Sequence, residues 1–159
     1  MTMLKMKIKI AGFLLMLFFF TACDNNTVYF QYHSINPALW NKDSLYTFDV
    51  DIENSQSAYS IYINVCNAPD YPNQNLWLFI SEITPDGVVV KDTIEFYLAD
   101  HRGKWLGSGA GSMKEMPVLY KQDFKFENSG THTFKIGHGM RADELKGITK
   151  IGMRVEKVN

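Results

Sequence analysis

The stretch Leu45-Tyr-Thr-Phe-Asp-Val-Asp-Ile52 decides the fold class of this 159-residue chain. From Tyr46 onward apolar side chains stand at every second position, and Asp49 and Asp51 stand between them. Successive side chains of a β-strand point to opposite faces, so this alternation predicts a strand with one buried and one solvated face. Strands of this kind bury their apolar faces against each other, which indicates a core built from sheets.

Several other segments carry strand signals. Tyr59–Val65 alternates in the same way, and Leu76–Ile80 is a continuous apolar run typical of a central strand. Thr84-Pro-Asp-Gly87 has the proline and glycine of a β-turn, which predicts a hairpin leading into a strand over 88–98. Further strands are predicted at Val28–Gln31, Lys121–Phe126, Thr131–Ile136 and Lys150–Lys157.

Helical patterns are scarce in the chain. The one predicted helix is short, from Arg141 to Lys146, and Gly147 would end it. About eight short strands joined by turns predict an all-β domain, an antiparallel β-sandwich of jelly-roll type. The spacing of the strands leaves their order, and the choice between sandwich and barrel, open.

The first 22 residues have the features of a bacterial lipoprotein signal peptide. A start with three lysines and no acid is followed by the apolar run Ile10–Phe20, which is short for a membrane-spanning helix. Small residues then precede Cys23, whose thiol would take a diacylglycerol after cleavage. The alternatives are an ordinary signal peptide with a chance cysteine, or a retained anchor.

This interpretation divides the chain into three parts. They are a signal peptide over 1–22, a lipidated tether over 23–27, and a single β-sandwich domain over 28–159. Acyl chains on Cys23 would hold the protein on a membrane. We therefore expect a lipid-anchored protein of the cell envelope, on the periplasmic face of the outer membrane.

Composition narrows the classes of function. The chain has 16 basic and 17 acidic residues, and the signal peptide removes three lysines, so the mature protein has 13 against 17 and a net charge of −4. A mildly acidic domain has no electrostatic reason to bind nucleic acid. With Cys23 lipidated, Cys66 is the one remaining thiol, so we expect no disulfide framework and a buried, unreactive side chain.

No motif points to catalysis, a metal or a cofactor. Asp49, Asp51 and Glu53 could bind calcium from one strand face, although such acids are usually a solvated face. Gly107-Ser-Gly-Ala-Gly111 lacks the lysine and hydroxyl of a phosphate loop, and the histidines lack metal-ligand spacing. We therefore assign no catalytic residue, no metal ligand and no cofactor.

A resemblance to a known family covers most of the chain. It lies in four stretches: Ala68-Pro-Asp-Tyr-Pro-Asn-Gln-Asn-Leu-Trp-Leu-Phe79, Asp92-Thr-Ile-Glu-Phe-Tyr-Leu-Ala-Asp100, Gly103-Lys-Trp-Leu-Gly-Ser-Gly109, and Gly130-Thr-His-Thr-Phe134 with Met140-Arg141. These stretches resemble the GldH lipoproteins of the phylum Bacteroidota. At Cys66 the chain departs from the pattern, where a basic residue is expected.

The resemblance implies a function without enzyme chemistry. GldH lipoproteins are required for gliding motility and are associated with the gliding and type IX secretion apparatus. The resemblance therefore implies a non-enzymatic accessory role, with other envelope lipoproteins or gliding and secretion components as partners. An envelope-anchored carbohydrate-binding module is the alternative, and a glycan hydrolase is the least favoured interpretation.

Candidate partner contacts lie mainly in two long loops, Asn67–Asn75 and Asp100–Pro117. Loops of this length in a compact domain are often functional, and Trp and Arg are favoured at interface hot spots. The candidates are Trp105, Arg102, Lys104, Met140, Arg141 and Tyr71. Tyr71, Trp77, Trp105 and Tyr120 could instead form a platform for sugar stacking, although Trp77 is expected in the core.

Overall fold

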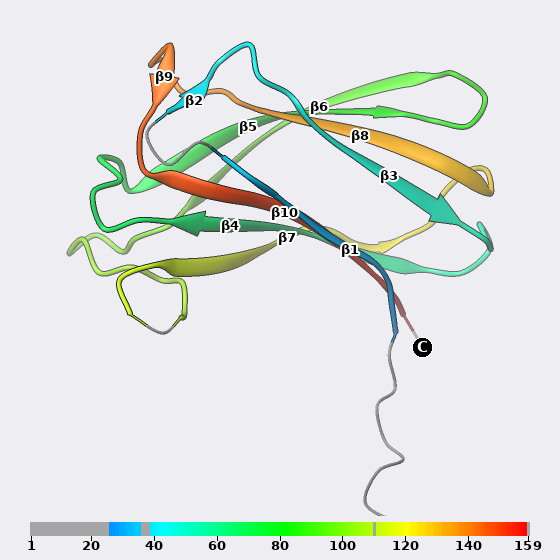
Figure 1. The fold of residues 1–159 in the computed structure, drawn as a ribbon. Coiled ribbons are helices and arrows are strands. Elements are labelled where there is room, and N and C mark those ends of the chain that lie inside the picture. The colour runs from blue at the N-terminus through cyan, green and yellow to red at the C-terminus, as the bar shows by residue number, and fades with distance from the viewer. Residues whose placement is uncertain (1–25, 36–38, 110, 159) are drawn as a thin grey trace, which may run out of the picture.

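The computed structural model describes residues 26–35, 39–109 and 111–158. Within these ranges the chain forms ten strands and no helix (Figure 1). The strands are β1 (Thr27–Ser34), β2 (Trp40–Asn41), β3 (Tyr46–Ile52), β4 (Tyr59–Asn67), β5 (Asn75–Ile83), β6 (Val89–Tyr97), β7 (Lys114–Phe124), β8 (Gly130–His138), β9 (Glu144–Leu145) and β10 (Ile148–Lys157). The all-β prediction is confirmed.

The eight long strands form two sheets that pack face to face. Sheet I has the order β1-β10-β4-β7, sheet II has the order β3-β8-β5-β6, and β2 pairs with β9 at one end (Figure 1). All paired strands are antiparallel. Along the chain the long strands alternate between the sheets except at the β5–β6 hairpin, which is the arrangement of a jelly roll.

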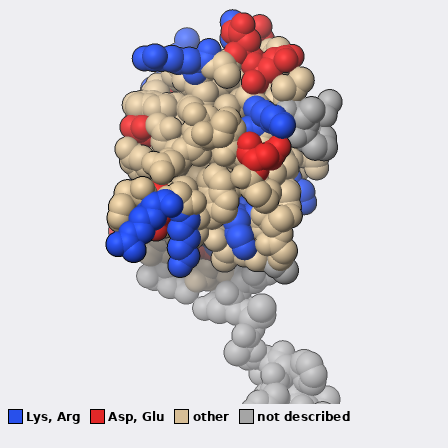
Figure 2. Space-filling model, turned by 90° about the vertical axis from the view of Figure 1, so that its left-hand side faces the viewer, with Lys and Arg blue, Asp and Glu red and all other residues tan. Residues whose placement is uncertain are grey.

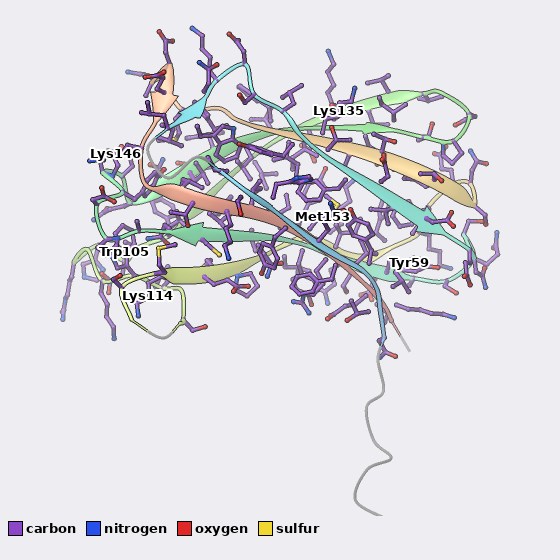
Figure 3. The ribbon with its side chains drawn as sticks, in the orientation of Figure 1. Tyr59, Trp105, Lys114, Lys135, Lys146 and Met153 are labelled. Carbon is purple, nitrogen blue, oxygen red and sulfur yellow. The ribbon has the colours of Figure 1, made fainter. Side chains whose placement is uncertain are left out.

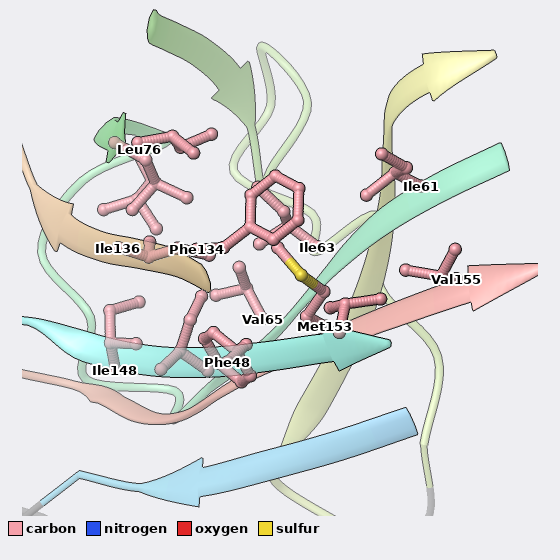
Figure 4. Close-up of a cluster of buried hydrophobic side chains, with 14 of the residues drawn as sticks. Phe48, Ile61, Ile63, Val65, Leu76, Phe134, Ile136, Ile148, Met153 and Val155 are labelled. Carbon is pink, nitrogen blue, oxygen red and sulfur yellow. The ribbon is translucent and has the colours of Figure 1, made fainter. Parts of the chain in front are cut away.

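The core fills the space between the two sheets. In β3 the predicted alternation holds, since Phe48, Val50 and Ile52 are buried while Asp49 and Asp51 face solvent. Side chains of both sheets share this interior (Figure 4). Its members include Ile61, Ile63, Val65, Leu76, Phe134, Ile136, Met153 and Val155. Burying one such side chain contributes about 1.5–3 kcal/mol, so this layer holds the sheets together.

The structure corrects the predicted helix over Arg141–Lys146. Glu144–Leu145 is the short strand β9, and Leu145 pairs with Trp40 of β2. Both side chains are buried. Six residues are too few to offset the cost of nucleating a helix, so burial of Leu145 decides the conformation.

The structure also corrects the assignment of Trp77 to the core. Strand β5 does lie between β8 and β6, as predicted for a central strand. Trp77 and Phe79 nevertheless point outward, 37% and 54% exposed, while Leu76 and Leu78 are buried. The reason is that each sheet of a sandwich has only one covered face.

The predicted signal peptide and Cys23 lie outside the described residues. In the part of the chain that the structure describes, no helix has the length and apolar character needed to cross a membrane.

A buried ionisable pair ties the β8 start to β5. His132 and Glu82 are 1% and 7% exposed, and Nδ1 of His132 lies 2.8 Å from Oε1 of Glu82. Nε2 of His132 lies 2.9 Å from the carbonyl oxygen of Asn128, which can only accept, so this nitrogen donates. The histidine therefore holds both the Glu82 carboxyl group and the turn before β8.

We predict that His132→Ala destabilises the domain by about 3–5 kcal/mol, because it leaves the Glu82 carboxyl group buried without its partner. Urea denaturation followed by circular dichroism would measure this. Thr131→Ala, at an exposed position of the same strand, should change the free energy of unfolding by less than about 0.5 kcal/mol. Equal effects of the two substitutions would contradict the assignment.

Candidate functional site

Three segments gather at one end of the sandwich, which we name the loop end: 67–75, 98–109 and 139–147. The backbone N–H of Ala68 donates to the carbonyl of Gly147 at 2.8 Å, and that of Leu98 donates to the carbonyl of Gln74 at 2.7 Å. Trp105, Lys114 and Lys146 mark this end in Figure 3. Five of the six predicted contacts lie on these segments at the surface or half-buried, and the sixth, Tyr71, lies inside.

Tyr71 supports the loop end from within. Its ring is 4% exposed, and its hydroxyl donates to the carbonyl of Asn75 at 2.7 Å. Burial raises the pKa of this hydroxyl to about 12. Gly147 crosses directly over Tyr71, since a Cβ atom on this glycine would lie 2.6 Å from the Tyr71 Cα. The ring is thus not available to a partner, which corrects the prediction of a surface contact at this residue.

Trp105 is half-buried at the loop end. It forms an isolated bridge with Ala99, and its ring centroid lies 6.4 Å from that of Tyr71. It also packs against the hydrophobic core. Part of the indole remains accessible, so Trp105 could contact a partner as an anchored rather than a mobile side chain.

Arg102 and Lys104 stand beside Trp105 on a tight turn. The Oδ1 atom of Asp100 accepts hydrogen bonds of 2.9 Å from the backbone N–H groups of both residues. Both side chains are exposed, and neither makes an ion pair with another described residue. The turn therefore presents two free cations next to the accessible part of Trp105.

Met140 and Arg141 line a separate groove of about 510 Å³ with Trp77. The Gly139 N–H donates to the Trp77 carbonyl at 2.7 Å, and the Trp77 N–H lies 3.4 Å from the Met140 sulfur. Asn73 and Asn75 complete the polar side of the groove. Neither amide was predicted from the sequence as a site residue. The signal that could have indicated them is their position just before Trp77, the first outward-facing aromatic residue of β5.

The four rings considered for a sugar platform do not form one surface. Tyr71 is buried, and the hydroxyl of Tyr120 donates a hydrogen bond to Asp92 at 3.1 Å. Burial, and then the charge of Asp92, raise the pKa of the Tyr120 hydroxyl. Of the four, Trp77 presents a ring to solvent on the outer face of sheet II.

Cys66 is buried on β4, as predicted. Burial, and then the nearby Glu115 carboxylate, raise the pKa of its thiol. Glu115 accepts hydrogen bonds from Asn64 at 2.9 Å and from the hydroxyl of Tyr32. The thiol therefore lacks the depressed pKa of a reactive cysteine.

Charge is unevenly spread over the loop end. Figure 2 looks onto this end and shows acidic side chains gathered mainly at the top. In the sequence, Asp43 follows β2 closely, Asp143 directly precedes β9, and Glu144 belongs to β9. Basic side chains appear at the upper left and over the lower part of the same view. Among the described residues, no group of three or more His, Cys, Asp or Glu side chains is arranged to hold a metal ion.

These features define a jelly-roll domain with organised loops at one end and exposed aromatic side chains on one sheet face. Residues 27–155 match the family model described as GldH lipoprotein, a match that spans the whole sandwich apart from its last residues. The chain belongs to the GldH lipoprotein family, so the resemblance seen in its sequence is confirmed.

Two relatives support this membership. Over 152 residues the chain is 38% identical to "Gliding motility lipoprotein GldH homolog" of Christiangramia forsetii, covering 91% of this chain and 93% of the relative. Over 160 residues it is 34% identical to "Gliding motility lipoprotein GldH" of Flavobacterium johnsoniae, covering 96% and 99%.

Among solved structures, the chain is similar to the infectious bursal disease virus VP2 subviral particle. The TM-score is 0.37 and the identity 15%, with 84% of this chain and 34% of that chain covered. This match is too distant to bear on function.

The contact between Gly147 and Tyr71 can be tested by substitution. Gly147 has φ +91° and Gly87 has φ +85°, but only Gly147 faces backbone atoms, since a Cβ on Gly87 would meet nothing within 4 Å. We predict a loss of about 1–2 kcal/mol for Gly87→Ala from backbone strain alone. Gly147→Ala adds overpacking and should cost about 3 kcal/mol or more.

Thermal or urea unfolding of the two variants would measure the difference. A Gly147→Ala protein no less stable than Gly87→Ala would show that the close crossing over Tyr71 does not organise the loop end.

Proposed function

We propose that this protein is a lipid-anchored, non-enzymatic accessory protein of the gliding motility and type IX secretion machinery. The observation that carries the proposal is the family match over 27–155, directly behind a lipoprotein-type signal sequence. Both relatives described above are named gliding motility lipoproteins. The cell envelope is the compartment in which such a protein acts, and we propose the periplasmic face of the outer membrane.

The position of β1 supports a defined orientation. Thr27, four residues after Cys23, pairs with Glu156 near the end of β10, whereas Ile148 at the start of β10 lies beside the loop end. The ten residues of β10 span roughly 30 Å at about 3.3 Å per residue. An anchor at Cys23 would thus hold one end of the sandwich near the membrane and direct the loop end away from it.

The loop end has the properties of a partner contact. Arg102 and Lys104 are free cations, and Trp105 is held rigidly beside them by the Asp100 turn and the bridge to Ala99. A fixed aromatic ring loses little conformational entropy on binding, and the neighbouring cations add charge for recognition. Other lipoproteins or envelope components of the machinery are the partners we propose, with Met140 and Arg141 as further contacts.

The lipid anchor is tested at Cys23. Cys23→Ala should abolish incorporation of a labelled fatty acid and release the protein from the membrane fraction, because the thiol that carries the diacylglycerol is gone. Globomycin, which inhibits the lipoprotein signal peptidase, should make the precursor of the wild type accumulate. Normal processing and membrane retention in both experiments would exclude the anchor. Cys66→Ala is the matched control and should leave acylation unchanged.

The partner surface is tested by affinity purification from native membranes. Arg102→Ala together with Trp105→Ala should deplete the co-purified envelope proteins by about tenfold or more, the range of a hot-spot loss. The exposed aromatic Phe30 on β1 offers a control, since Phe30→Ala lies on sheet I and should leave co-purification unchanged. An unchanged partner set in the folded double variant would reject this surface.

A further inference from the structure

The outer face of sheet II carries several exposed apolar side chains. Leu45, Phe79 and Tyr97 are 56%, 54% and 57% exposed, and Trp77 is 37% exposed. Trp77 and Phe79 lie on the central strand β5, and Tyr97 lies on β6 opposite Asn75. Isolated exposed hydrophobic residues are common, but a contiguous set on one sheet face marks a binding surface.

Two glycines on β8 and just after it shape this face. Gly137 is paired with Phe79, and a Cβ on Gly137 would lie 2.8 Å from the Leu45 side chain. A Cβ on Gly139 would lie 3.1 Å from the Phe79 ring and 3.2 Å from the Trp77 Cβ. The Leu45 side chain and the Phe79 ring therefore lie over glycine backbone, and Trp77 stands beside Gly139, so these positions form an apolar floor.

Two grooves lie along this floor. The groove of about 510 Å³ contains Trp77 with Asn73, Asn75 and Arg141. A second groove, of about 310 Å³, contains Phe79 and Leu45 with Lys91, Lys135 and Asp92. Because Trp77 and Phe79 are alternate residues of one strand, the two grooves adjoin, and both volumes are close to those of small-molecule sites.

The charges of the two grooves are not balanced. Arg141, Lys91 and Lys135 make no ion pair within the described ranges of the chain. One carboxylate, Asp92, lines the second groove, and Glu95 lies opposite Trp77 on β6, so the three cations outnumber the carboxylates near the grooves. Asp92 accepts from the Tyr120 hydroxyl and the Thr93 N–H, and Glu95 accepts from the Asn75 amide at 2.6 Å. An otherwise acidic domain thus places free cations at both ends of an aromatic floor.

We propose that this face of sheet II binds an acidic oligosaccharide. The apolar faces of pyranose rings would stack on Trp77 and Phe79, and the Asn73 amide would hydrogen-bond hydroxyl groups. Arg141 would bind a sugar carboxylate in a bidentate manner, which its planar guanidinium favours. Lys91 and Lys135 would receive a second acidic group further along the same strand direction.

Other occupants fit this surface less well. A peptide adding to the sheet would use the free edge of β3 or β6 and not the middle of its face. A membrane surface would use the cations and aromatic rings but not the Asn73 and Asn75 amides of the first groove. The proposal does not depend on the lipid anchor or on the Arg102–Trp105 surface. It shares Arg141 with the proposed partner contacts, so the experiment uses defined sugar probes in place of envelope proteins to separate the two.

The test is calorimetric titration of the detergent-solubilised full-length protein with three probes. They are trigalacturonate as an acidic sugar, maltotriose as a neutral sugar, and a tetraglutamate peptide as an acidic chain without sugar rings. We expect binding of trigalacturonate, weaker in added salt because of the charges. Binding of the other two should be at least about tenfold weaker, since each lacks one half of the recognition.

Trp77→Ala and Arg141→Ala should each weaken trigalacturonate binding by about tenfold or more. Arg141 is exposed, so its variant keeps the test valid if Trp77→Ala does not fold. Arg102→Ala and Phe30→Ala are matched controls away from the grooves and should bind normally. The proposal is overturned if the wild type does not bind trigalacturonate up to about 10 mM. It is also overturned if either other probe binds as well, or if the Trp77 and Arg141 variants bind unchanged.

Discussion

Burial of one face of each sheet in a common core is the constraint on which the rest of this structure depends. Phe48, Ile63, Phe134 and Met153 come from four strands in two sheets and fill the same layer. Close packing of that layer fixes the register of the strands, because a slip of one residue would turn every apolar side chain outward. The outer faces are free of this constraint, so they and the loops can carry function.

The outer faces of the two sheets carry different kinds of side chains. On sheet I the ring of Tyr32 lies over Gly152, and Glu115 receives hydrogen bonds from Tyr32 and Asn64, so polar groups satisfy one another within the face. On sheet II the glycines admit apolar side chains that remain exposed. Exposed apolar side chains occur on both faces, Phe30 on sheet I among them, but on sheet II they lie beside cations that make no ion pair with another described residue.

The sequence allowed the strands to be predicted where alternation was visible. In β3 and β4 the apolar residues at alternate positions are the side chains that face the core. The prediction for Trp77 was wrong, because a continuous apolar run such as Leu76–Ile80 does not show which side chains face inward. The exposure of Trp77 depends on which face of its sheet the other sheet covers. The family was recognisable because its motifs are local, spaced runs of residues.

The candidate site was predictable only in part. Arg102, Lys104 and Trp105 share a short turn, so their grouping followed from the sequence. The burial of Tyr71 could not be predicted in this way, since it depends on Gly147, which is far away along the chain. Gly147 meets Tyr71 because the start of β10 pairs with the end of β4. The groove at Arg141 likewise combines residues after β8 with Asn73 and with Asn75 and Trp77 of β5, a grouping that no local pattern encodes.

The pairing of β1 has a mechanical consequence. Strand β1 is an edge strand held along its length by β10, from Thr27 to Ser34. A load between a tether before Thr27 and a partner at the loop end would run parallel to both strands. Interstrand hydrogen bonds lie across that direction, so they would bear the load together in shear instead of opening in turn like a zipper. A protein anchored through this strand would resist a pulling force best along the axis from the membrane to the partner.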